Sequence, residues 1–446
     1  MGRLIVRLTF GLLLATALVA CDSNSLDDEL REIIAEQRLE PISGVVAPTP
    51  ELFELGEALF FDNILSGNRD ISCATCHHPL AASGDGLSLP VGTKGVGLTT
   101  NRTLGWDRDL IPRNAPDLFN RGASGWFTMF WDSRVAGTPE DGFTTPAGND
   151  LPEGLDSVLA AQAMFPPTSP AEMLGRPGDV AATGHINEVA SETSIDAIWD
   201  TLTNRVLTIP EYRTMFAGAF PDLAVEDIGF EHIANAISAY EAAAFSFVDS
   251  AWDRYLTGDS SALNEDAKRG AVLFYGKAGC GGCHTGPLLT DQLIHSVAPP
   301  QVGPGRGEEA PDDWGRESVS RNFADRYGFR TPPLRNVELT GPWFHDGAYV
   351  ALEMAIRHFL DPATALSLYD PSLLRADVSE FYIVDEARSE QAIELLDPRL
   401  VVPKSLTDEQ IANLEQFLLA LTDPAARDLA HMVPSSVPSG IPVDGN

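Results

Sequence analysis

Two copies of one short motif constrain this chain more than any other feature of its sequence. Each copy is a C-x-x-C-H run, and together they contain Cys73, Cys76, His77, Cys280, Cys283 and His284. Two thiols at this spacing can add to the two vinyl groups of one porphyrin, and the adjacent imidazole can ligate its iron. A zinc site would need further ligands at suitable spacing, and a thioredoxin-like pair would need a βαβ context; the sequence indicates neither. The motifs therefore predict two covalently bound c-type haems.

The fifth cysteine, Cys21, follows a segment that is typical of an export signal. Arg3 and Arg7 precede an apolar run at 8–17, which is too short to span a membrane as a mature helix. The Leu-Val-Ala-Cys that ends in this cysteine resembles a bacterial lipobox, in which the cysteine is lipidated and becomes the new N-terminus. We therefore predict a lipid anchor at a membrane surface, in preference to a soluble secreted form. Bacteria generally attach haem outside the inner membrane, so we expect a periplasmic location.

The charge of the chain limits its partners. Its formal net charge is −34, with 30 Lys and Arg against 64 Asp and Glu. Nucleic acid is excluded as an expected partner, because phosphate binding needs a basic surface. The acidic exterior can serve solubility alone. It can also steer a basic redox partner toward a haem edge, because charge complementarity raises association rates.

The segments before the two motifs resemble each other, which indicates an internal duplication. Gly-Glu-Ala-Leu-Phe-Phe at 56–61 corresponds to Gly-Ala-Val-Leu-Phe-Tyr at 270–275, and apolar residues recur at helical spacing in both. Helices are also predicted at 228–252 and after a capping box that begins at Thr407, whereas Pro, Gly and charge at 296–333 predict a long loop. Strand signals are sparse. We therefore predict a mainly α fold of two cytochrome c-like haem domains with long irregular loops.

The expected boundaries follow from these features and from shifts in composition. A segment that is acidic and then contains proline follows the signal, and a loosely held tail follows the last helix. The predicted segments are the lipoprotein signal peptide 1–20, the tether 21–48, the N-terminal haem domain 49–255, the C-terminal haem domain 256–425 and the tail 426–446.

Four further blocks carry a resemblance to a known family. They are Arg113–Pro116, Phe130–Arg134, Thr331–Val337 and Gly341–Gly347. Together with the two motifs, they occur in the order seen in bacterial di-haem cytochrome c peroxidases and the related MauG-type enzymes. The match runs from about residue 50 to residue 422. The resemblance implies a periplasmic oxidoreductase that uses hydrogen peroxide, with the first haem as the peroxidatic site and the second as the electron-transfer haem.

Three functions remain open from the sequence. A hydrogen-peroxide reductase would receive electrons from a small redox protein, either a cytochrome c or a cupredoxin. A MauG-like enzyme would instead oxidise a protein or another organic substrate. The alternative outside catalysis is a non-catalytic di-haem electron-transfer cytochrome, which would leave the catalytic residues implied by the family without a purpose.

The resemblance also implies the catalytic residues. Gln162, in a Gln-Ala pair, and Glu172, ten residues later, keep the family's spacing. Gln162 should orient the bound oxygen species, and Glu172 should move its protons. Phe130 should wall the pocket, and Trp131 should lie between the haems and shorten the electron-tunnelling gap. Without the resemblance, Glu172 would be interpreted as a solvated carboxylate at a helix start and Trp131 as a core residue.

This chain departs from the peroxidase branch in the loop after the first motif. In that branch, a loop histidine occupies the first iron in the resting enzyme, and the loop must move before peroxide binds. Here no histidine lies between His78 and His185, and His78 adjoins the proximal ligand and cannot easily reach the opposite face. We therefore expect a five-coordinate first haem without reductive activation, as in the MauG-type branch. Residues 135–161 form an insertion relative to the short peroxidases and have no assigned role.

The second haem departs from both branches at its sixth ligand. The family has a methionine or a tyrosine fourteen residues after the histidine that matches His345, but this chain has Phe359, which has no lone pair. The nearby donors are His358 and Met354, which share a face of a predicted helix. We expect His358 to ligate the iron, with Met354 as the second choice and a five-coordinate haem as the remaining alternative.

The resemblance finally implies a calcium ion between the domains. Asn114, Thr340 and Pro342 match positions that bind it, one through a side-chain oxygen and two through backbone carbonyls. Hard oxygen ligands of this kind suit calcium, and waters complete its coordination shell.

Overall fold

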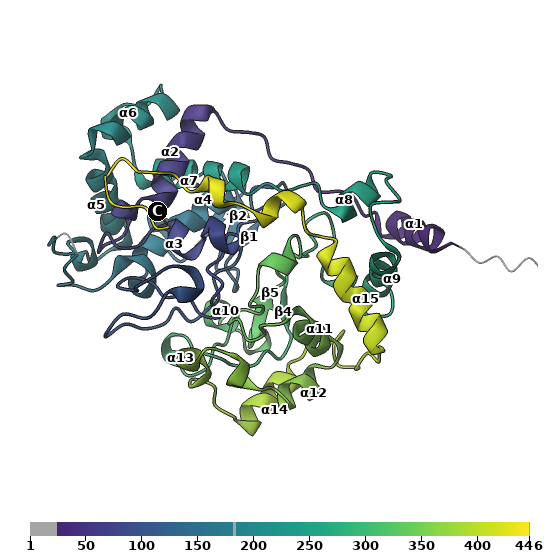
Figure 1. Cartoon of the computed structure of the whole chain (residues 1–446). Helices are drawn as coiled ribbons and strands as arrows, with labels where there is room; N and C mark the ends of the chain where they lie inside the picture. Colours follow the sequence, from purple (N-terminus) through teal and green to yellow (C-terminus); the bar gives the residue numbers. More distant parts are fainter. Residues whose placement is uncertain (1–24, 182–183, 446) are drawn as a thin grey trace, which may run out of the picture.

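The computed structural model describes residues 25–181 and 184–445 (Figure 1). The predicted signal peptide and Cys21 lie outside these residues. In the part of the chain that is described, no helix combines the length and the apolar character that crossing a membrane requires.

The fold is mainly helical, as predicted, and its few strands are short. The helices are α1 (Leu26–Gln37), α2 (Pro50–Phe61), α3 (Cys73–Cys76), α4 (Val158–Ala163), α5 (Ile195–Leu207), α6 (Pro210–Ala219), α7 (Phe230–Ala244), α8 (Ala251–Leu256), α9 (Glu265–Tyr275), α10 (Glu317–Ser320), α11 (Leu352–Leu360), α12 (Pro362–Ser367), α13 (Ala376–Ser379), α14 (Glu386–Glu394) and α15 (Asp408–Leu419). The strands are β1 (Thr128–Met129), β2 (Val135–Thr138), β3 (Gly142–Thr144), β4 (Ile294–Ser296) and β5 (Gly328–Arg330). They form two small antiparallel sheets, in the orders β1-β2-β3 and β4-β5.

The first unit, which contains the first motif, is built around the crossing of α2 and α7. Thr49 caps the N-terminus of α2: its side chain accepts a hydrogen bond from the backbone N–H of Leu52, and Pro50 occupies the first helical position. Gly56 lies at the crossing, where a Cβ would approach the backbone oxygen of Ala236 in α7 to 2.0 Å. The glycine therefore allows α2 to lie directly on the backbone of α7.

The second unit, which contains the second motif, repeats this crossing with α9 and α15. Asn264 caps the first turn of α9, and α15 follows the capping box predicted from the sequence. A Cβ at Gly270 would approach the backbone oxygen of Asn413 in α15 to 1.9 Å. Gly270 corresponds to Gly56 in the duplicated hexapeptide. Both copies of the sequence therefore use a glycine for the same close helix crossing.

The segment before α2 is not a tether over its described length, contrary to the prediction for 21–48. Its helix α1 packs against α9 of the second unit (Figure 1), where Leu30 is fully buried. Asp27 accepts hydrogen bonds from Tyr255 (2.8 Å) and from Lys268 (3.1 Å). Apolar burial and ion pairing therefore dock a segment whose composition alone indicated a tether.

The prediction of a loose tail at 426–446 is wrong for its described part. The chain passes from α15 back to the first unit (Figure 1), where Val437 and Val443 are buried in the core. The side chain of Asp444 accepts a hydrogen bond from the hydroxyl of Thr75 (2.6 Å), inside the first C-x-x-C-H motif. Residues 426–445 therefore form a C-terminal strap across the first unit.

The long loop predicted at 296–333 extends from the second unit to the first. β4 and β5 lie at its two ends and pair with each other. Within it, the guanidinium of Arg306 reaches the carboxylate of Asp132 in the first unit (2.9 Å). The stretch to which the sequence assigned no role contributes the β2–β3 hairpin, which packs beside α4.

Candidate functional site

The first motif opens onto a cavity of about 400 Å³ in the first unit. Cys73, Cys76 and His77, in and just after α3, line it. The Nδ1 of His77 donates to the backbone oxygen of Ser83 (3.2 Å), which leaves the lone pair on Nε2. Burial lowers the pKa of His77 to about 4, so the ring is neutral, as a metal ligand needs to be.

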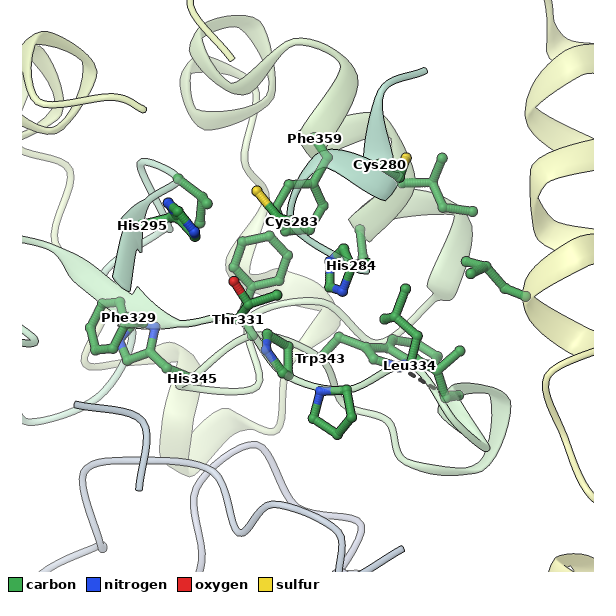
Figure 2. A pocket seen from close by; sticks show the side chains of 18 of the residues that line it. Cys280, Cys283, His284, His295, Phe329, Thr331, Leu334, Trp343, His345 and Phe359 are labelled. Carbon is green, nitrogen blue, oxygen red and sulfur yellow. Dashed lines mark hydrogen bonds between the residues drawn. The ribbon is translucent and has the colours of Figure 1, made fainter. Parts of the chain in front are cut away.

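The second motif lines a cavity of about 210 Å³ in the second unit (Figure 2). Cys280, Cys283 and His284 border it, and the Nδ1 of His284 donates to the backbone oxygen of Leu289 (3.1 Å). Burial lowers the pKa of His284 to about 4. The two motifs therefore present the same arrangement to their cavities: two thiols and one neutral imidazole.

These arrangements fit covalently bound haem. The four motif cysteines are free thiols, and each pair borders a largely apolar cavity. The guanidinium of Arg121 lines both cavities, and its Nη1 is buried without an acceptor among the described residues. A porphyrin matches both features, because its vinyl groups suit the thiols and its propionates suit a buried donor. The residues of each motif would hold one haem.

The predicted catalytic side chains share the first cavity. Gln162 lies near the end of α4, and Glu172 lies in a π-helical turn at 170–174; both line the cavity. The loop after the first motif supports this turn, because Gly92 packs directly on it. A Cβ at Gly92 would approach the backbone oxygen of Ala171 to 1.8 Å.

A buried ion-pair network around Asp132 borders the same cavity. Asp132 pairs with Arg113 (2.6 Å), Arg134 (3.1 Å) and Arg306 (2.9 Å). Arg306 comes from the long loop of the second unit, whereas the other residues belong to the first. Burial raises the pKa of Glu172, and Arg134 and Arg306 oppose that shift. The network therefore helps to set the pH above which Glu172 is a carboxylate.

Phe130 and Trp131 both line the first cavity, and Trp131 lines the second as well. The φ of Phe130 is 65°, a left-handed conformation that is rare for a bulky residue, and Arg134 stacks on its ring at 3.5 Å from the centroid. The indole Nε1 of Trp131 donates to the backbone oxygen of Asn114 (3.0 Å). This bond orients the indole in the wall between the two cavities.

The three residues predicted to bind calcium line the second cavity together. Asn114 also lines the first, and its side-chain amide donates to the backbone oxygen of Leu87 (2.8 Å). The structure thus brings Asn114, Thr340 and Pro342 to one cavity wall, and a calcium ion there stays a prediction.

His358, expected as the sixth ligand of the second iron, does not line the second cavity. It is fully buried; its Nε2 donates to the backbone oxygen of Val297 (2.7 Å), and its Nδ1 accepts from the hydroxyl of Tyr349 (2.8 Å). Met354 packs in a separate cluster. The α11 residues that do line the cavity are Leu352, Ala355, Ile356, Phe359 and Leu360. This geometry argues against His358 as a ligand, because both ring nitrogens are already bonded to the protein.

Comparison with known proteins assigns the chain to a family. The sequence profile of the family described as di-haem cytochrome c peroxidase matches residues 50–261. The methylamine utilization protein MauG of Methylorubrum extorquens is 33% identical over 314 residues, which are 70% of this chain and 69% of that protein. The chain belongs to the di-haem cytochrome c peroxidase family. Another relative of this di-haem peroxidase, the cytochrome c551 peroxidase of Pseudomonas aeruginosa, is 31% identical over 77% of this chain and 82% of its own.

Two solved structures resemble this di-haem peroxidase. A MauG-like protein associated with microbial copper homeostasis is 28% identical, with a TM-score of 0.60, and the alignment covers 87% of this chain and 94% of that one. The diheme peroxidase BthA of Burkholderia thailandensis has a TM-score of 0.56 over 86% of this chain and 90% of its own. BthA is 22% identical, so this second likeness concerns the fold alone.

The structure adds charged groups to the di-haem peroxidase that sequence reasoning missed. Beside the second motif, His295 lies between Asp291 (2.9 Å) and Asp397 (2.8 Å). In the first cavity, Glu241 of α7 is buried, its Oε2 has no partner among the described residues, and burial raises its pKa to about 8. No residue pattern distinguished these groups from ordinary surface or helix positions. The network of Asp132 did have a signal, because this residue stands inside one of the family's sequence blocks.

Proposed function

We propose that this enzyme uses hydrogen peroxide as its oxidant at the haem of the first motif, and that the haem of the second motif passes or stores electrons. The observation that carries the proposal is the position of Glu172, a partly buried carboxyl group that lines the same cavity as His77 and Gln162. A carboxylate there can move protons while a peroxide bond is cleaved. A non-catalytic electron carrier would have no use for it.

The side chains of the first cavity have distinct roles in this proposal. When bound, the haem supplies the iron at which the O–O bond is cleaved and the store for the oxidising equivalents. Glu172 accepts a proton from the near oxygen of hydrogen peroxide and returns it to the far oxygen, which leaves as water. Gln162 orients the peroxide by hydrogen bonding, and Phe130 walls the pocket. Such general acid–base work is typically worth ~10²- to 10⁴-fold in rate.

We infer that the first cavity is open to peroxide in the resting ferric enzyme. Of the described histidines, only His77 lines it. His78 is buried elsewhere, where its ring nitrogens contact the backbone N–H of Leu80 (3.1 Å) and the backbone oxygen of Asp444 (3.2 Å). The loop after the motif carries no histidine that could block the iron. The first haem is therefore proposed to be five-coordinate and to need no reductive opening.

Trp131 is proposed as the electron route between the haems. It lines both cavities, and its hydrogen bond to Asn114 orients the ring. An oriented aromatic ring in that wall divides one long tunnelling step into two shorter ones. A calcium ion bound by Asn114, Thr340 and Pro342 would strengthen the same wall.

The missing loop histidine favours a MauG-like oxidase of a protein or another organic substrate. The second candidate is a peroxide reductase that receives electrons from a small cytochrome or cupredoxin, for which the acidic exterior would attract a basic partner. The N-terminal sequence supports export to the periplasm and lipid anchoring through Cys21 at a membrane surface.

One experiment tests the core of this proposal. The as-isolated ferric holoprotein is mixed with one equivalent of hydrogen peroxide in a stopped-flow spectrometer, without a prior reductant. We expect the spectra of both haems to change within the reaction. A protein that reacts only after reduction contradicts the open cavity, and one that reacts in neither state contradicts the peroxide function.

A further inference from the structure

The wall between the two cavities carries more positive charge than its own carboxyl groups can pair. The residues that line both cavities are Asn114, Pro116, Asp117, Arg121, Trp131 and Arg330. Two of them are arginines and one is an aspartate. This excess is unusual in a chain whose formal net charge is −34.

Arg330, at the end of β5, is a buried cation without a carboxylate partner. Its guanidinium donates from Nε to the backbone oxygen of Phe130 (3.1 Å) and from Nη1 to that of Thr331 (3.4 Å), and the residue is 3% exposed. Among the described residues, no carboxylate lies within 4.0 Å of its guanidinium. Burial and repulsion from Arg121 lower the pKa of Arg330 to about 9. An unpaired buried charge is costly, so this position calls for an anion.

Arg121 has an unused donor beside it. Its Nη2 pairs with the carboxylate of Asp117 (3.2 Å), but its Nη1 is buried without an acceptor in the described part of the chain. Both guanidiniums lie over Trp126, at 4.8 Å for Arg121 and 5.3 Å for Arg330 from the ring centroid. The indole Nε1 of Trp126 is bonded to the backbone oxygen of Asn120 (2.8 Å). One fixed ring therefore holds two like charges close together.

We propose that Arg121 and Arg330 form a shared binding site for haem propionates, with a carboxylate arriving from each cavity. Guanidinium groups bind carboxylates through paired, charge-assisted hydrogen bonds, and these two line both cavities. Propionates from the two cavities would supply an acceptor for Nη1 of Arg121 and a negative charge beside Arg330. The proposal rests on the presence of both haems and is independent of the reaction with peroxide.

The shared site places the same two positive charges near both haems, where they influence the ferric–ferrous equilibrium of each. A positive charge near a haem favours its ferrous form, because reduction lowers the charge of the iron by one. Since both guanidiniums serve both cavities, a change at one arginine should shift both haems. A residue that only supports one fold unit would not have this effect.

The test is potentiometric titration of the holoprotein, followed through the separate spectra of the two haems. For Arg330→Gln and Arg121→Gln, we expect the ferric-to-ferrous ratio of both haems at a fixed potential to rise about tenfold, equivalent to ~59 mV for a one-electron couple. Arg330→Lys should recover most of the shift, because it restores the charge. The thioether bonds keep the haems in place, and mass spectrometry checks their number.

The matched control is Arg326→Gln. Arg326 also stacks on a tryptophan, Trp314, at 3.9 Å and pairs with Glu317, but it lines neither cavity. We expect its titration to match the wild type. A shift in reduction potential that is confined to one haem, or that Arg326→Gln equals, overturns the proposal. Because no peroxide is used, this outcome is separate from a failure of the proposed function.

Discussion

The indole nitrogen of Trp131 is bonded to the backbone oxygen of Asn114 at 3.0 Å, and both residues line both cavities. The proposed electron route and a proposed calcium ligand are therefore parts of one wall. A change at this wall should affect communication between the haems more than the chemistry of either cavity.

Trp131→Phe keeps an aromatic ring but removes the bond to Asn114 and shortens the ring. We expect the first haem to react with peroxide at the native rate, while oxidation of the second haem slows. Stopped-flow absorbance at the bands of the two haems measures both phases. Trp106→Phe is the control, because Trp106 is 94% exposed and lines neither cavity. If the second haem of Trp131→Phe oxidises at the native rate, the electrons follow another route.

Glu172→Gln preserves the shape of the side chain and removes the proton acceptor. The rate of the peroxide reaction should fall by ~10²- to 10⁴-fold with both haems still bound. Glu241→Gln is a matched control, because Glu241 is another carboxyl-bearing residue that lines the same cavity, and it is buried. The Glu241→Gln variant should react with peroxide at close to the native rate. An equal loss of rate in the two variants would contradict the role of Glu172 as the group that moves the protons.

The pH dependence of the peroxide reaction should depend on Arg306. Glu172 acts as a base only above its pKa, which burial raises and which Arg134 and Arg306 lower. Arg306→Gln removes one lowering charge, so the acid limb of the rate profile should move to higher pH, and the rate should recover in alkaline buffer.

The control for this prediction is Arg316→Gln in the same long loop. The guanidinium of Arg316 donates to the backbone oxygens of Asp132 and Ser133, so its loss should leave the acid limb in place. A movement to lower pH in Arg306→Gln, or the same movement in both variants, would contradict the electrostatic argument.

The second iron should not depend on His358. Both ring nitrogens of His358 are bonded to the protein, and Phe359 lines the cavity instead. We expect His358→Ala to leave the electron paramagnetic resonance signals of the ferric protein unchanged. Phe359→His should convert the second haem to a low-spin form, because it places an imidazole on the cavity wall. Loss of a low-spin signal in His358→Ala would instead support His358 as a ligand of the second iron.

The glycine crossing of α2 and α7 should be sensitive to a single methyl group. Gly56→Ala should lower the free energy of unfolding by ~1–3 kcal/mol, since its Cβ would meet the backbone oxygen of Ala236. In α6, a Cβ at Gly218 would have its nearest neighbour at 3.6 Å, so Gly218→Ala should be neutral or stabilising by up to ~1 kcal/mol. Unfolding in guanidinium chloride measures both. Equal stability of the two variants would show that the crossing can relax.

The sequence could predict what depends on local pattern. The C-x-x-C-H spacing located both cavities, and the capping box of α15 and the repeated glycine hexapeptide located two crossing helices. Gln162 and Glu172, which the family's spacing of ten residues singled out, line one cavity, and their catalytic roles stay predictions. These features are readable because each lies within a few residues of chain.

Long-range packing explains what the sequence could not predict. Leu30 is buried against α9, which lies far away in the chain, so the segment around it has the composition of a tether without being one. Arg306 enters the first cavity from a loop of the second unit. The apolar face of α11 lines the second cavity as a whole, and His358 does not belong to that face.

The bond between Thr75 and Asp444 joins residues 369 positions apart, and one of them stands between the two cysteines of the first motif. Haem attachment needs both thiols within reach of the porphyrin and of the attachment machinery. The strap can make this contact only after the chain has been synthesised as far as residues near 444. The surroundings of the first C-x-x-C-H motif are therefore completed by some of the last described residues of the chain.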